Sequence, residues 1–328
     1  MTAGSDAGST PDKKESVNDC PLVDPYSRRI DYLRISLTQE CNHVCFFCHR
    51  EGETCAGTEM TPDEIERLVK VTNQRGIRRI KLTGGEALLR EDIVEIIRRL
   101  APLTDDLSLT TNGSRLHELA LPLRDAGLDR VNVSLHTLNH ALHEYITGVQ
   151  DLEEIKQGIE TAIEVGLTPV KLNMPILAGF NDNEIPEIME YAGRIGAILQ
   201  LIELQNMPDE DRWKRYWFDL TPIEEDLERR AVKVTQRSLH GRKQYTIPLD
   251  KTTVQVEVVK PQHNHSFCQR CTRLRVTSDG KLKPCFLRQD NLVEVRSLLS
   301  GGSNSELINE ALEQATRLRE PYWKGASK

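Results

Sequence analysis

Residues 33–48 read Leu-Arg-Ile-Ser-Leu-Thr-Gln-Glu-Cys-Asn-His-Val-Cys-Phe-Phe-Cys. The first six alternate apolar and polar side chains, which is typical of a β-strand. Cys41, Cys45 and Cys48 follow within a few residues, so we expect them on a loop at the carboxyl end of that strand. α/β barrels carry their chemistry at this end of their strands. The stretch therefore predicts an α/β protein with a cysteine site at a strand end.

The spacing Cys-x3-Cys-x2-Cys favours an iron–sulfur cluster. Cubane clusters are held by cysteine thiolates, normally four, so three ligands leave one iron open to bind a small molecule. A zinc site with His43 or His49 as the fourth ligand is an alternative, although neither histidine fits the usual pair spacing. Unligated thiols are another. We expect Phe46 and Phe47 to form a hydrophobic cover for the site.

The composition is that of an ordinary soluble protein. With 328 residues, 38% hydrophobic content and a net charge of −7, the chain suits one large α/β domain or a domain with an added layer. No apolar stretch approaches the ~20 residues of a membrane span, and the negative charge disfavours nucleic acid as a partner. The first twenty residues lack the apolar core of a secretion signal, so we expect a cytoplasmic protein with free thiols at Cys20 and Cys55.

Strand-like and helix-like segments alternate through the middle of the chain. Six predicted strands cover Leu33–Thr38, Ile77–Leu82, Leu107–Thr110, Arg130–Leu135, Leu167–Asn173 and Ala197–Leu204. Predicted helices begin at Thr61, cover Asp92–Leu100 and Ile185–Ile195, and end at Ala126-Gly127 and Val165-Gly166. Repeated β–α units imply a parallel sheet. Because six units fall short of the eight in a closed barrel, we predict a partial, open (β/α)6 TIM-like barrel, with a doubly wound sheet as the alternative.

The pattern changes after about residue 230. Alternating segments predict antiparallel strands at Val232–Ser238, Gln244–Pro248 and Val254–Val259, and a hairpin of Leu274–Thr277 and Lys281–Pro284. Two short helices are expected between about residues 289 and 320. This antiparallel and helical layer is expected to close the open side of the barrel. The predicted organisation is a disordered tail at 1–20, the barrel at 21–230 and the C-terminal layer at 231–328.

The C-terminal layer carries a second cysteine triplet, Cys268, Cys271 and Cys285. It again lacks an obvious fourth cysteine. Three thiolates with an imidazole of His263 or His265 would make a zinc site, which stays an alternative to a second iron–sulfur cluster.

Two arginines lie between the last two of these cysteines. On a strand, Arg273 and Arg275 point to the same face. Guanidinium groups bind phosphate bidentately, so the pair suits an anionic ligand beside the site. A solvated surface face is the alternative.

Polar residues follow the other predicted strands. Gly84-Gly85-Glu86 ends the second strand, where adjacent glycines let a ligand approach the backbone and Glu86 is able to accept a hydrogen bond from an ammonium group. Other strand-end candidates are Thr110, Ser134, His136, Lys171, Asn173, Glu203 and Gln205. Arg34 and Lys171 are the strand cations most suited to phosphate or sugar contacts, because charges on barrel strands are rarely buried without a partner.

The first triplet, with an aromatic residue before its last cysteine, resembles that of the radical S-adenosylmethionine (SAM) superfamily, and Gly84-Gly85-Glu86 matches the superfamily's SAM amino-group motif. The second triplet, Cys-x2-Cys-x13-Cys enclosing Arg-x-Arg, is similar to that of the GTP 3′,8-cyclase family (molybdenum cofactor biosynthesis protein A). The resemblance covers roughly residues 25–322. It implies a lyase that converts GTP to (8S)-3′,8-cyclo-7,8-dihydroguanosine 5′-triphosphate in molybdenum cofactor biosynthesis.

The resemblance also implies residue roles. The metal ligands of two 4Fe-4S clusters would be Cys41, Cys45 and Cys48, which bind SAM through the first cluster, and Cys268, Cys271 and Cys285. The SAM contacts would be Phe47, Gly84, Gly85, Glu86, Ser134 and Gln205. The GTP contacts would be Arg34, Lys81, Thr110, Lys171, Arg273, Leu274 and Arg275. No separate catalytic side chain is implied, because the radical is generated at the first cluster.

The chain departs from the family pattern at three places. Ala87 follows Gly-Gly-Glu where proline is usual. Gln205 stands where methionine is common, and Met207 is an alternative contact for SAM. The chain ends without the Gly-Gly pair that many members carry.

The resemblance further implies an electron donor such as flavodoxin or ferredoxin, a downstream cyclic pyranopterin monophosphate synthase, and a monomer or homodimer. Two other functions stay open from the sequence. One is a radical SAM peptide-modifying enzyme with an auxiliary cluster. The other is an iron–sulfur electron carrier or scaffold, which would have no use for Gly84-Gly85-Glu86 or the strand cations.

Overall fold

The computed structural model describes residues 21–53, 57–205, 210–237, 239–300 and 305–324. The predicted disordered tail, Cys20, Cys55, Met207 and the last four residues lie outside the described residues. Within them, no helix is long and apolar enough to cross a membrane.

The described residues contain one sheet of twelve strands. Its order is β12-β11-β10-β1-β2-β3-β4-β5-β6-β9-β8-β7. The strands are β1 Tyr32–Ser36, β2 Arg79–Thr83, β3 Asp106–Thr111, β4 Arg130–Ser134, β5 Lys171–Ile176, β6 Ile198–Glu203, β7 Lys233–Gln236, β8 Lys243–Pro248, β9 Thr253–Val259, β10 Arg273–Val276, β11 Lys281–Lys283 and β12 Val293–Glu294.

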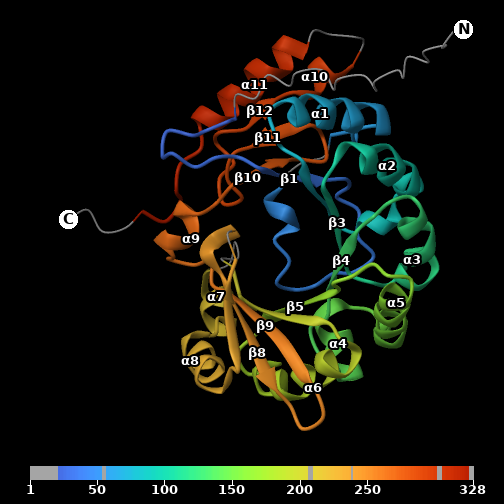
Figure 1. Ribbon diagram of the computed structural model, residues 1–328, viewed down its shortest axis with the longest axis vertical. Helices are drawn as coiled ribbons and strands as arrows, with labels where there is room; N and C mark the ends of the chain where they lie inside the picture. The colour runs from blue at the N-terminus through green and yellow to red at the C-terminus, as the bar shows by residue number, and fades with distance from the viewer. Residues whose placement is uncertain (1–20, 54–56, 206–209, 238, 301–304, 325–328) are drawn as a thin grey trace, which may run out of the picture.

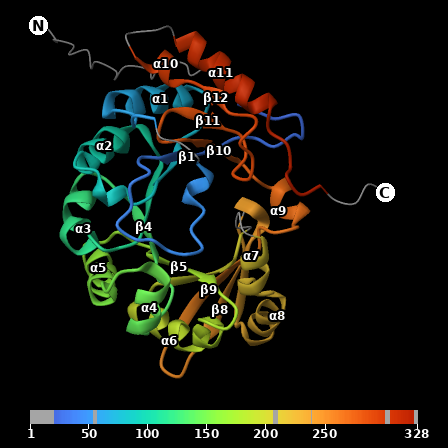
Figure 2. The same ribbon diagram turned by 180° about the vertical axis from the view of Figure 1, so that it is seen from behind.

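Strands β1 to β6 pair in parallel, each with the next in the chain. Figures 1 and 2 show these strands curving around the interior, with helices on the outer side. The helices are α1 Pro62–Gln74, α2 Ile93–Leu100, α3 Leu116–Asp125, α4 His140–Thr147, α5 Leu152–Glu164, α6 Ile185–Ile195, α7 Glu210–Tyr216, α8 Thr221–Arg230, α9 His265–Gln269, α10 Arg296–Leu299 and α11 Ser305–Arg317. The sheet is not closed, because β12 and β7 are its two ends. The predicted partial barrel is confirmed.

The C-terminal strands extend this sheet at both ends. The predicted antiparallel pairs are present, β10 with β11 and β8 with β9. In addition, β9 pairs in parallel with β6, and β10 pairs in parallel with β1. The alternation of apolar residues did not predict these parallel pairs. They bring residues 253–283 against both ends of the barrel, and α9 lies between the two ends (Figure 1).

Two element boundaries differ from the prediction for physical reasons. The fifth strand begins at Lys171 rather than Leu167, where Pro169 has no N–H to donate to a ladder. Two helices, α4 and α5, lie between β4 and β5 where one was predicted. Helix α4 ends at Gly148, whose left-handed φ of 77° stops the helix before α5 begins.

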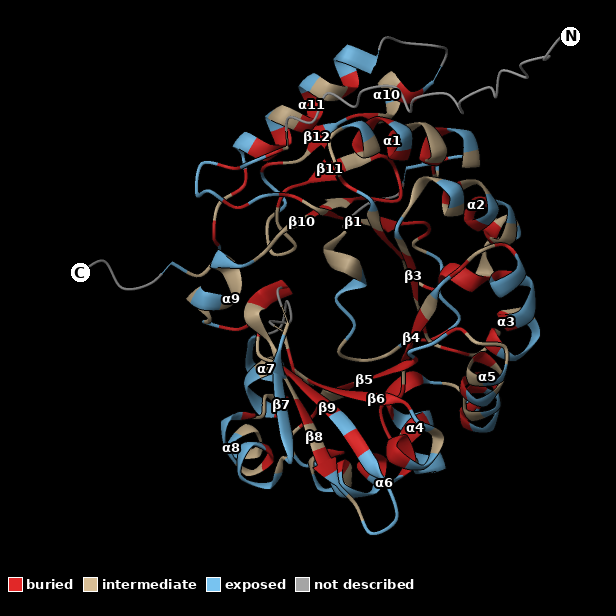
Figure 3. Cartoon of the chain, viewed as in Figure 1, coloured by how far each residue is buried: buried red, intermediate tan, exposed pale blue. Residues whose placement is uncertain are grey.

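The main core lies between the sheet and the outer helices. The outward residues of the parallel strands, such as Ile35, Leu82 and Val133, are fully buried there. Figure 3 shows the central strands buried along their length, with the outer faces of the helices exposed. A smaller apolar cluster around Phe46 and Tyr216 lies at the other side of the cysteine loop. The polar inner face of the sheet is therefore free to form a site.

Helix α1 follows the cysteine loop and begins with a capping box. The Thr61 hydroxyl accepts a hydrogen bond from the Glu64 backbone N–H at 3.2 Å, and the Glu64 carboxylate accepts one from the Thr61 N–H at 2.8 Å. Pro62 occupies the first helical turn, where its missing N–H costs nothing. These contacts fix the point at which the loop ends and the helix begins.

We expect Thr61→Ala to lower the free energy of unfolding by about 1 kcal/mol, because the first turn of α1 loses its cap. Thr61→Ser keeps the hydroxyl and is the matched control, expected to stay within about 0.5 kcal/mol of the wild type. Urea unfolding followed by circular dichroism measures both. Equal stability of Thr61→Ala and Thr61→Ser would contradict a role for the cap.

Candidate functional site

A cavity of about 770 Å³ lies on the inner face of the curved sheet. Most of the predicted site residues line it, from strands at both ends of the chain. These are Arg34, Phe47, Lys81, Thr110, Ser134, Lys171, Gln205, Cys268, Cys271, Arg273, Arg275 and Cys285, together with the strand-end candidates His136, Asn173 and Glu203. Gly84, Gly85, Glu86, Leu274 and the first three cysteines are not part of its wall.

The two arginines of β10 face the cavity together, as the strand pattern predicted. Leu274 between them points to the other face of the sheet, where it is fully buried in the core. The Arg273 guanidinium lies 5.1 Å from the centre of the Tyr32 ring, and that of Arg275 lies 4.7 Å from the Phe286 ring. Burial lowers the pKa of Arg273 to about 9, helped by the nearby cations Arg275 and Arg34. Positive charge is thus concentrated on this wall.

A carboxylate that the sequence analysis missed joins two of these cations. Glu51, just beyond the first triplet, accepts from Arg34 at 2.5 Å and from Arg275 at 3.2 Å. Its carboxylate also accepts from the Thr83 hydroxyl at 3.1 Å. Although burial opposes it, Arg34 and Arg275 lower the pKa of Glu51 to about 2. The carboxylate is therefore ionised and occupies the space between the two guanidinium groups.

A second cation pair lies deeper, on the strands of the barrel. The Lys81 ammonium donates to the Asn132 side-chain carbonyl at 2.7 Å. The Lys171 ammonium lies 2.7 Å from a carboxylate oxygen of Glu257 on β9. Burial lowers the pKa of both lysines, that of Lys171 to about 8. An incoming anion would therefore stabilise the charged form of both lysines.

The second cysteine triplet lies where α9 and the end of β11 meet the cavity. Arg28 donates to the Cys268 carbonyl at 2.8 Å, and Arg319 donates to the Cys271 carbonyl at 2.7 Å. Both arginines also pair with Asp24. Although burial raises it, Arg319 and Arg273 lower the pKa of the Cys271 thiol. Three thiols among arginines fit an iron–sulfur cluster, whose thiolate ligands give it negative charge.

The first triplet lies on the loop between β1 and α1. Cys41 and Cys48 are exposed and Cys45 is partly buried. Burial and, to a lesser extent, the neighbouring thiols Cys48 and Cys41 raise the pKa of Cys45 to about 12. The three sulfur atoms are thus close enough to repel one another as thiolates, which a bound cluster would relieve. Phe47 of this loop lines the cavity, and its ring contacts the His136 ring edge-on with the ring centres 5.2 Å apart.

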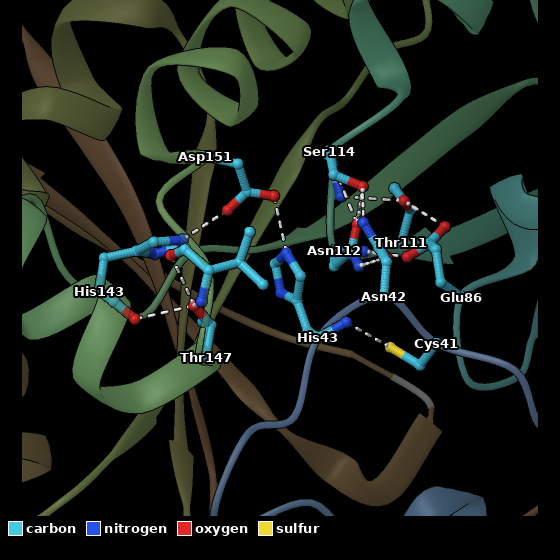
Figure 4. Close-up of polar contacts among 12 residues, drawn as sticks. Cys41, Asn42, His43, Glu86, Thr111, Asn112, Ser114, His143, Thr147 and Asp151 are labelled. Atoms are coloured by element: carbon cyan, nitrogen blue, oxygen red, sulfur yellow. Dashed lines mark hydrogen bonds and ion pairs between the residues drawn. The ribbon is translucent and has the colours of Figure 1, made fainter.

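This loop is fixed by a network that the sequence analysis did not predict (Figure 4). His43 lies within the triplet and is buried, and its Nε2 lies 2.7 Å from one carboxylate oxygen of Asp151. His143 of α4 lies 2.8 Å from the other oxygen. The Val44 N–H also donates to the Thr147 carbonyl at 2.8 Å. The only sequence signal was the position of His43 between two cysteines.

Gly84 and Gly85 hold the other side of the same loop. The Gly85 N–H donates to the Thr38 carbonyl at 2.8 Å, and the next N–H donates to the Glu40 carbonyl at 2.7 Å. A Cβ on Gly85 would lie only 2.2 Å from the Glu40 carbonyl oxygen. The glycines therefore let the cysteine loop approach β2, which is a reason for their presence independent of any ligand.

Glu86 is fully buried beside them and has three donors from the chain. Its carboxylate accepts from the Thr111 hydroxyl at 2.7 Å, the Leu88 N–H at 2.9 Å and the Asn112 N–H at 2.5 Å (Figure 4). Burial raises its pKa. These bonds join the ends of β2 and β3, and the contact of Glu86 with an ammonium group stays a prediction.

Comparison with known proteins agrees with this arrangement. The family model described as Radical SAM superfamily matches residues 35–192, and the one described as Molybdenum Cofactor Synthesis C matches residues 197–325. A probable GTP 3′,8-cyclase of Thermococcus kodakarensis is 52% identical over 307 residues, which are 92% of this chain and 100% of the relative. One from Methanothermobacter marburgensis is 46% identical over 92% of this chain and 98% of its own length.

The chain belongs to the GTP 3′,8-cyclase family of radical SAM proteins.

Solved structures extend the likeness at the level of the fold. Streptococcus suis SuiB bound to S-adenosylmethionine superposes with a TM-score of 0.60 at 16% identity, over 90% of this chain and 68% of that one. The structure titled native anSMEcpe with bound AdoMet gives a TM-score of 0.51 at 14% identity, over 85% of this chain and 83% of that one. The fold of this cyclase-family chain is therefore shared with distant structures that hold S-adenosylmethionine.

We expect Gly85→Ala to displace the cysteine loop. The added Cβ would clash with backbone atoms of Glu40, which cannot rotate away as a side chain can. Anaerobically reconstituted protein should lose the first cluster, or about four iron atoms per chain, by iron assay and electron paramagnetic resonance. Gly179→Ala is the control. Gly179 has a left-handed φ of 75°, and no atom lies within 4 Å of the new Cβ. It should cost about 1 kcal/mol of stability and keep its iron. Full iron content in Gly85→Ala would contradict this packing role.

Proposed function

We propose that this protein is a GTP 3′,8-cyclase, a lyase that forms (8S)-3′,8-cyclo-7,8-dihydroguanosine 5′-triphosphate for molybdenum cofactor biosynthesis. The observation that carries the proposal is the shared cavity: Cys268, Cys271 and Cys285 line the same space as Arg34, Lys81, Lys171, Arg273 and Arg275. Relatives named probable GTP 3′,8-cyclase cover nearly the whole chain, which supports it. The cavity of about 770 Å³ is large enough for a nucleotide and a second small molecule.

The cations of the cavity bind the nucleotide in this proposal. Its phosphates carry several negative charges, and the lysines and arginines of the wall provide charge-assisted donors for them. Lys81 and Lys171 are buried, so contact with an anion stabilises their charged forms. Thr110 adds a hydroxyl to the same wall. The Leu274 side chain lies in the core, so in this proposal it separates the two arginines on β10 and does not itself reach the nucleotide.

The cofactors in this proposal are SAM and two 4Fe-4S clusters. When bound, SAM and the first cluster supply a carbon radical that removes a hydrogen atom from the substrate. Cys41, Cys45 and Cys48 hold that cluster, and Phe47, Ser134 and Gln205 contact SAM from the cavity side. Gly84, Gly85 and Glu86 at the end of β2 also contact SAM in this proposal, in addition to packing against the cysteine loop. Residues Cys268, Cys271 and Cys285 hold the second cluster against the nucleotide.

The alternatives from the sequence are less well supported. A peptide-modifying enzyme has fold-level likeness on its side, since Streptococcus suis SuiB bound to its precursor peptide gives a TM-score of 0.61, but the identity is only 15%. The cyclase-family relatives match at 41–52% identity.

We further propose an electron donor of the flavodoxin or ferredoxin kind, a downstream cyclic pyranopterin monophosphate synthase, a cytoplasmic location, and a monomer or homodimer. The division into a barrel at 21–230 and a C-terminal layer at 231–328 is part of the same proposal.

The direct test is product formation by anaerobically reconstituted protein with SAM, a reductant and GTP. We expect GTP to increase the release of 5′-deoxyadenosine and to be converted to a cyclised product detectable by mass spectrometry. ATP in place of GTP is the control and should give neither change. If GTP leaves the release of 5′-deoxyadenosine unaltered in protein that holds both clusters, the cyclase function is wrong.

The lowered pKa of Lys171 predicts a pH dependence of GTP binding. The ammonium carries its charge below the pKa of about 8 and loses it above, so the contribution of Lys171 to binding is present at neutral pH and falls as the pH rises through 8. We expect the affinity for GTP to drop about fourfold between pH 6.5 and pH 8.5, the loss of charge that a pKa of 8 gives.

Equilibrium dialysis of wild type and Lys171→Arg measures this. Arginine stays charged over the whole range, so the variant corrects for every other titrating group, including Arg273 and GTP itself. Its affinity should change less than twofold relative to its value at pH 6.5. The same pH dependence in wild type and Lys171→Arg would remove Lys171 from the nucleotide site.

A further inference from the structure

Glu257 on β9 is a buried carboxylate that none of the roles above uses. It has no exposed surface, and it lies within reach of three cations of the cavity wall. Its oxygens lie 2.7 Å from the Lys171 ammonium, 2.6 Å from Nε of Arg237 and 3.5 Å from the Arg242 guanidinium. Burial opposes ionisation, yet Lys171, Arg242 and Arg237 lower the pKa of Glu257 to about 2. It is therefore an anion at the centre of a cation cluster.

The sheet fixes where Glu257 points. It pairs with Gln200 of β6 on one side and with Gln244 of β8 on the other, so these three side chains share the inner face. Gln200 donates to its carboxylate at 2.5 Å, and Gln244 donates at 3.0 Å. The side-chain amides of these two strand neighbours thus hold the carboxylate in place. The cations are aligned to it.

Arg237 and Arg242 are brought to Glu257 by the connection between β7 and β8. The Arg237 backbone N–H donates to the Arg242 carbonyl at 2.8 Å, so the two arginines flank one narrow loop. Both line the cavity with Lys171. Within the described part of the chain, the buried Nε of Arg242 has no hydrogen-bond acceptor.

Among the residues that the structure describes, the charge of this group is not balanced. One carboxylate faces three cations, of which Lys171 is 7% and Arg242 12% exposed at the side chain. Buried charges are normally paired, and a buried donor without an acceptor costs free energy. An anion with several charges that enters from the cavity would supply that acceptor.

We infer that Glu257 is a positioning residue that aligns Lys171, Arg237 and Arg242 as a preformed site for the oligophosphate end of the nucleotide. The inference rests on the proposed function, and it adds two arginines and their anchor to the residues that select the substrate. A diphosphate or triphosphate bridges cations spaced around one carboxylate, while a nucleoside without phosphates leaves them unmatched. The site therefore favours GTP over guanosine through its charge.

The experiment uses the full chain with both clusters, reconstituted anaerobically. Equilibrium dialysis measures the affinities for GTP, guanosine and inorganic tripolyphosphate in wild type, Glu257→Gln and Glu257→Asp. Removal of the charge lets the three cations repel one another, so Glu257→Gln should weaken GTP and tripolyphosphate about tenfold and guanosine less than twofold. Glu257→Asp keeps a negative charge and should recover GTP binding to within about threefold. Glu228→Gln, which breaks the exposed pair of Glu228 with Lys243, is the matched control and should change none of these.

Kinetics separate positioning from a general structural role. In 5′-deoxyadenosine formation, Glu257→Gln should raise the KM for GTP about tenfold with kcat changed less than threefold. Equal losses for GTP and guanosine, or wild-type affinity for tripolyphosphate, would overturn the inference. If Glu257→Gln does not fold, Arg242→Gln decides in its place, since it leaves Glu257 paired with Lys171. It should weaken tripolyphosphate severalfold, and no change would overturn the inference.

The outcomes also separate this inference from the proposed function. If tripolyphosphate binding depends on Glu257 while GTP yields no product in the wild type, the phosphate site stands and the cyclase function is wrong. If GTP is cyclised and Glu257→Gln binds tripolyphosphate like the wild type, the cyclase function stands and the positioning role of Glu257 is wrong.

Discussion

The parallel pairing of β10 with β1 sets Arg273 and Arg275 beside Tyr32 and Arg34, residue against residue along the two strands. One edge of the six parallel strands is β1, and β10 from the far end of the chain pairs with it. Side chains opposite one another on paired strands face the same side. The second cysteine triplet follows from this pairing, because Cys271 and Cys285 flank the β10–β11 hairpin. The pairing of β9 with β6 does the same at the other edge and brings Glu257 next to Lys171.

This pairing concentrates positive charge, which the fold must hold apart. Two unit charges of like sign 4 Å apart repel by about 4 kcal/mol at the effective dielectric near a protein surface. Two carboxylates of the cavity region reduce this repulsion, because each contacts more than one cation. Glu51 lies between Arg34 and Arg275, and Glu257 lies among Lys171, Arg237 and Arg242. Neither carboxylate neutralises its neighbours completely, so the cavity keeps the excess charge that a nucleotide requires.

The cysteine loop depends on contacts that lie outside the cavity. On one side, Gly84 and Gly85 let it pack against the end of β2. On the other, Asp151 joins a histidine of the loop to one of α4. As ligands of a cluster the three cysteines must be thiolates, which repel one another, so a loop without such supports would let them separate. A cluster site made of three cysteines on one short segment therefore depends on β2 and α4, which hold that segment in place.

Several features were predictable because they depend on neighbours in the sequence. The strand before the first triplet, the spacing of Cys41, Cys45 and Cys48, and the common face of Arg273 and Arg275 all follow from local periodicity. The capping box at Thr61 and the hairpin of Leu274–Thr277 and Lys281–Pro284 are equally local. The cysteine motif and the alternation of strand-like and helix-like segments were enough to predict the partial barrel, because each β–α unit has its own sequence pattern.

Tertiary structure decided what depends on residues far apart in the chain. The alternation in Val254–Val259 did not reveal that Glu257 would meet Lys171, because the strand pairing that joins them spans 86 positions. The bonds of Glu86 are long-range in the same way: its buried carboxylate accepts from donors of β3 and the loop after it, which the sequence did not reveal. His43 and Asp151, 108 positions apart, meet only when α4 and α5 pack beside the cysteine loop. The sequence determined which groups are present and the local shape of each segment, while long-range pairing and burial decided which charges face one another.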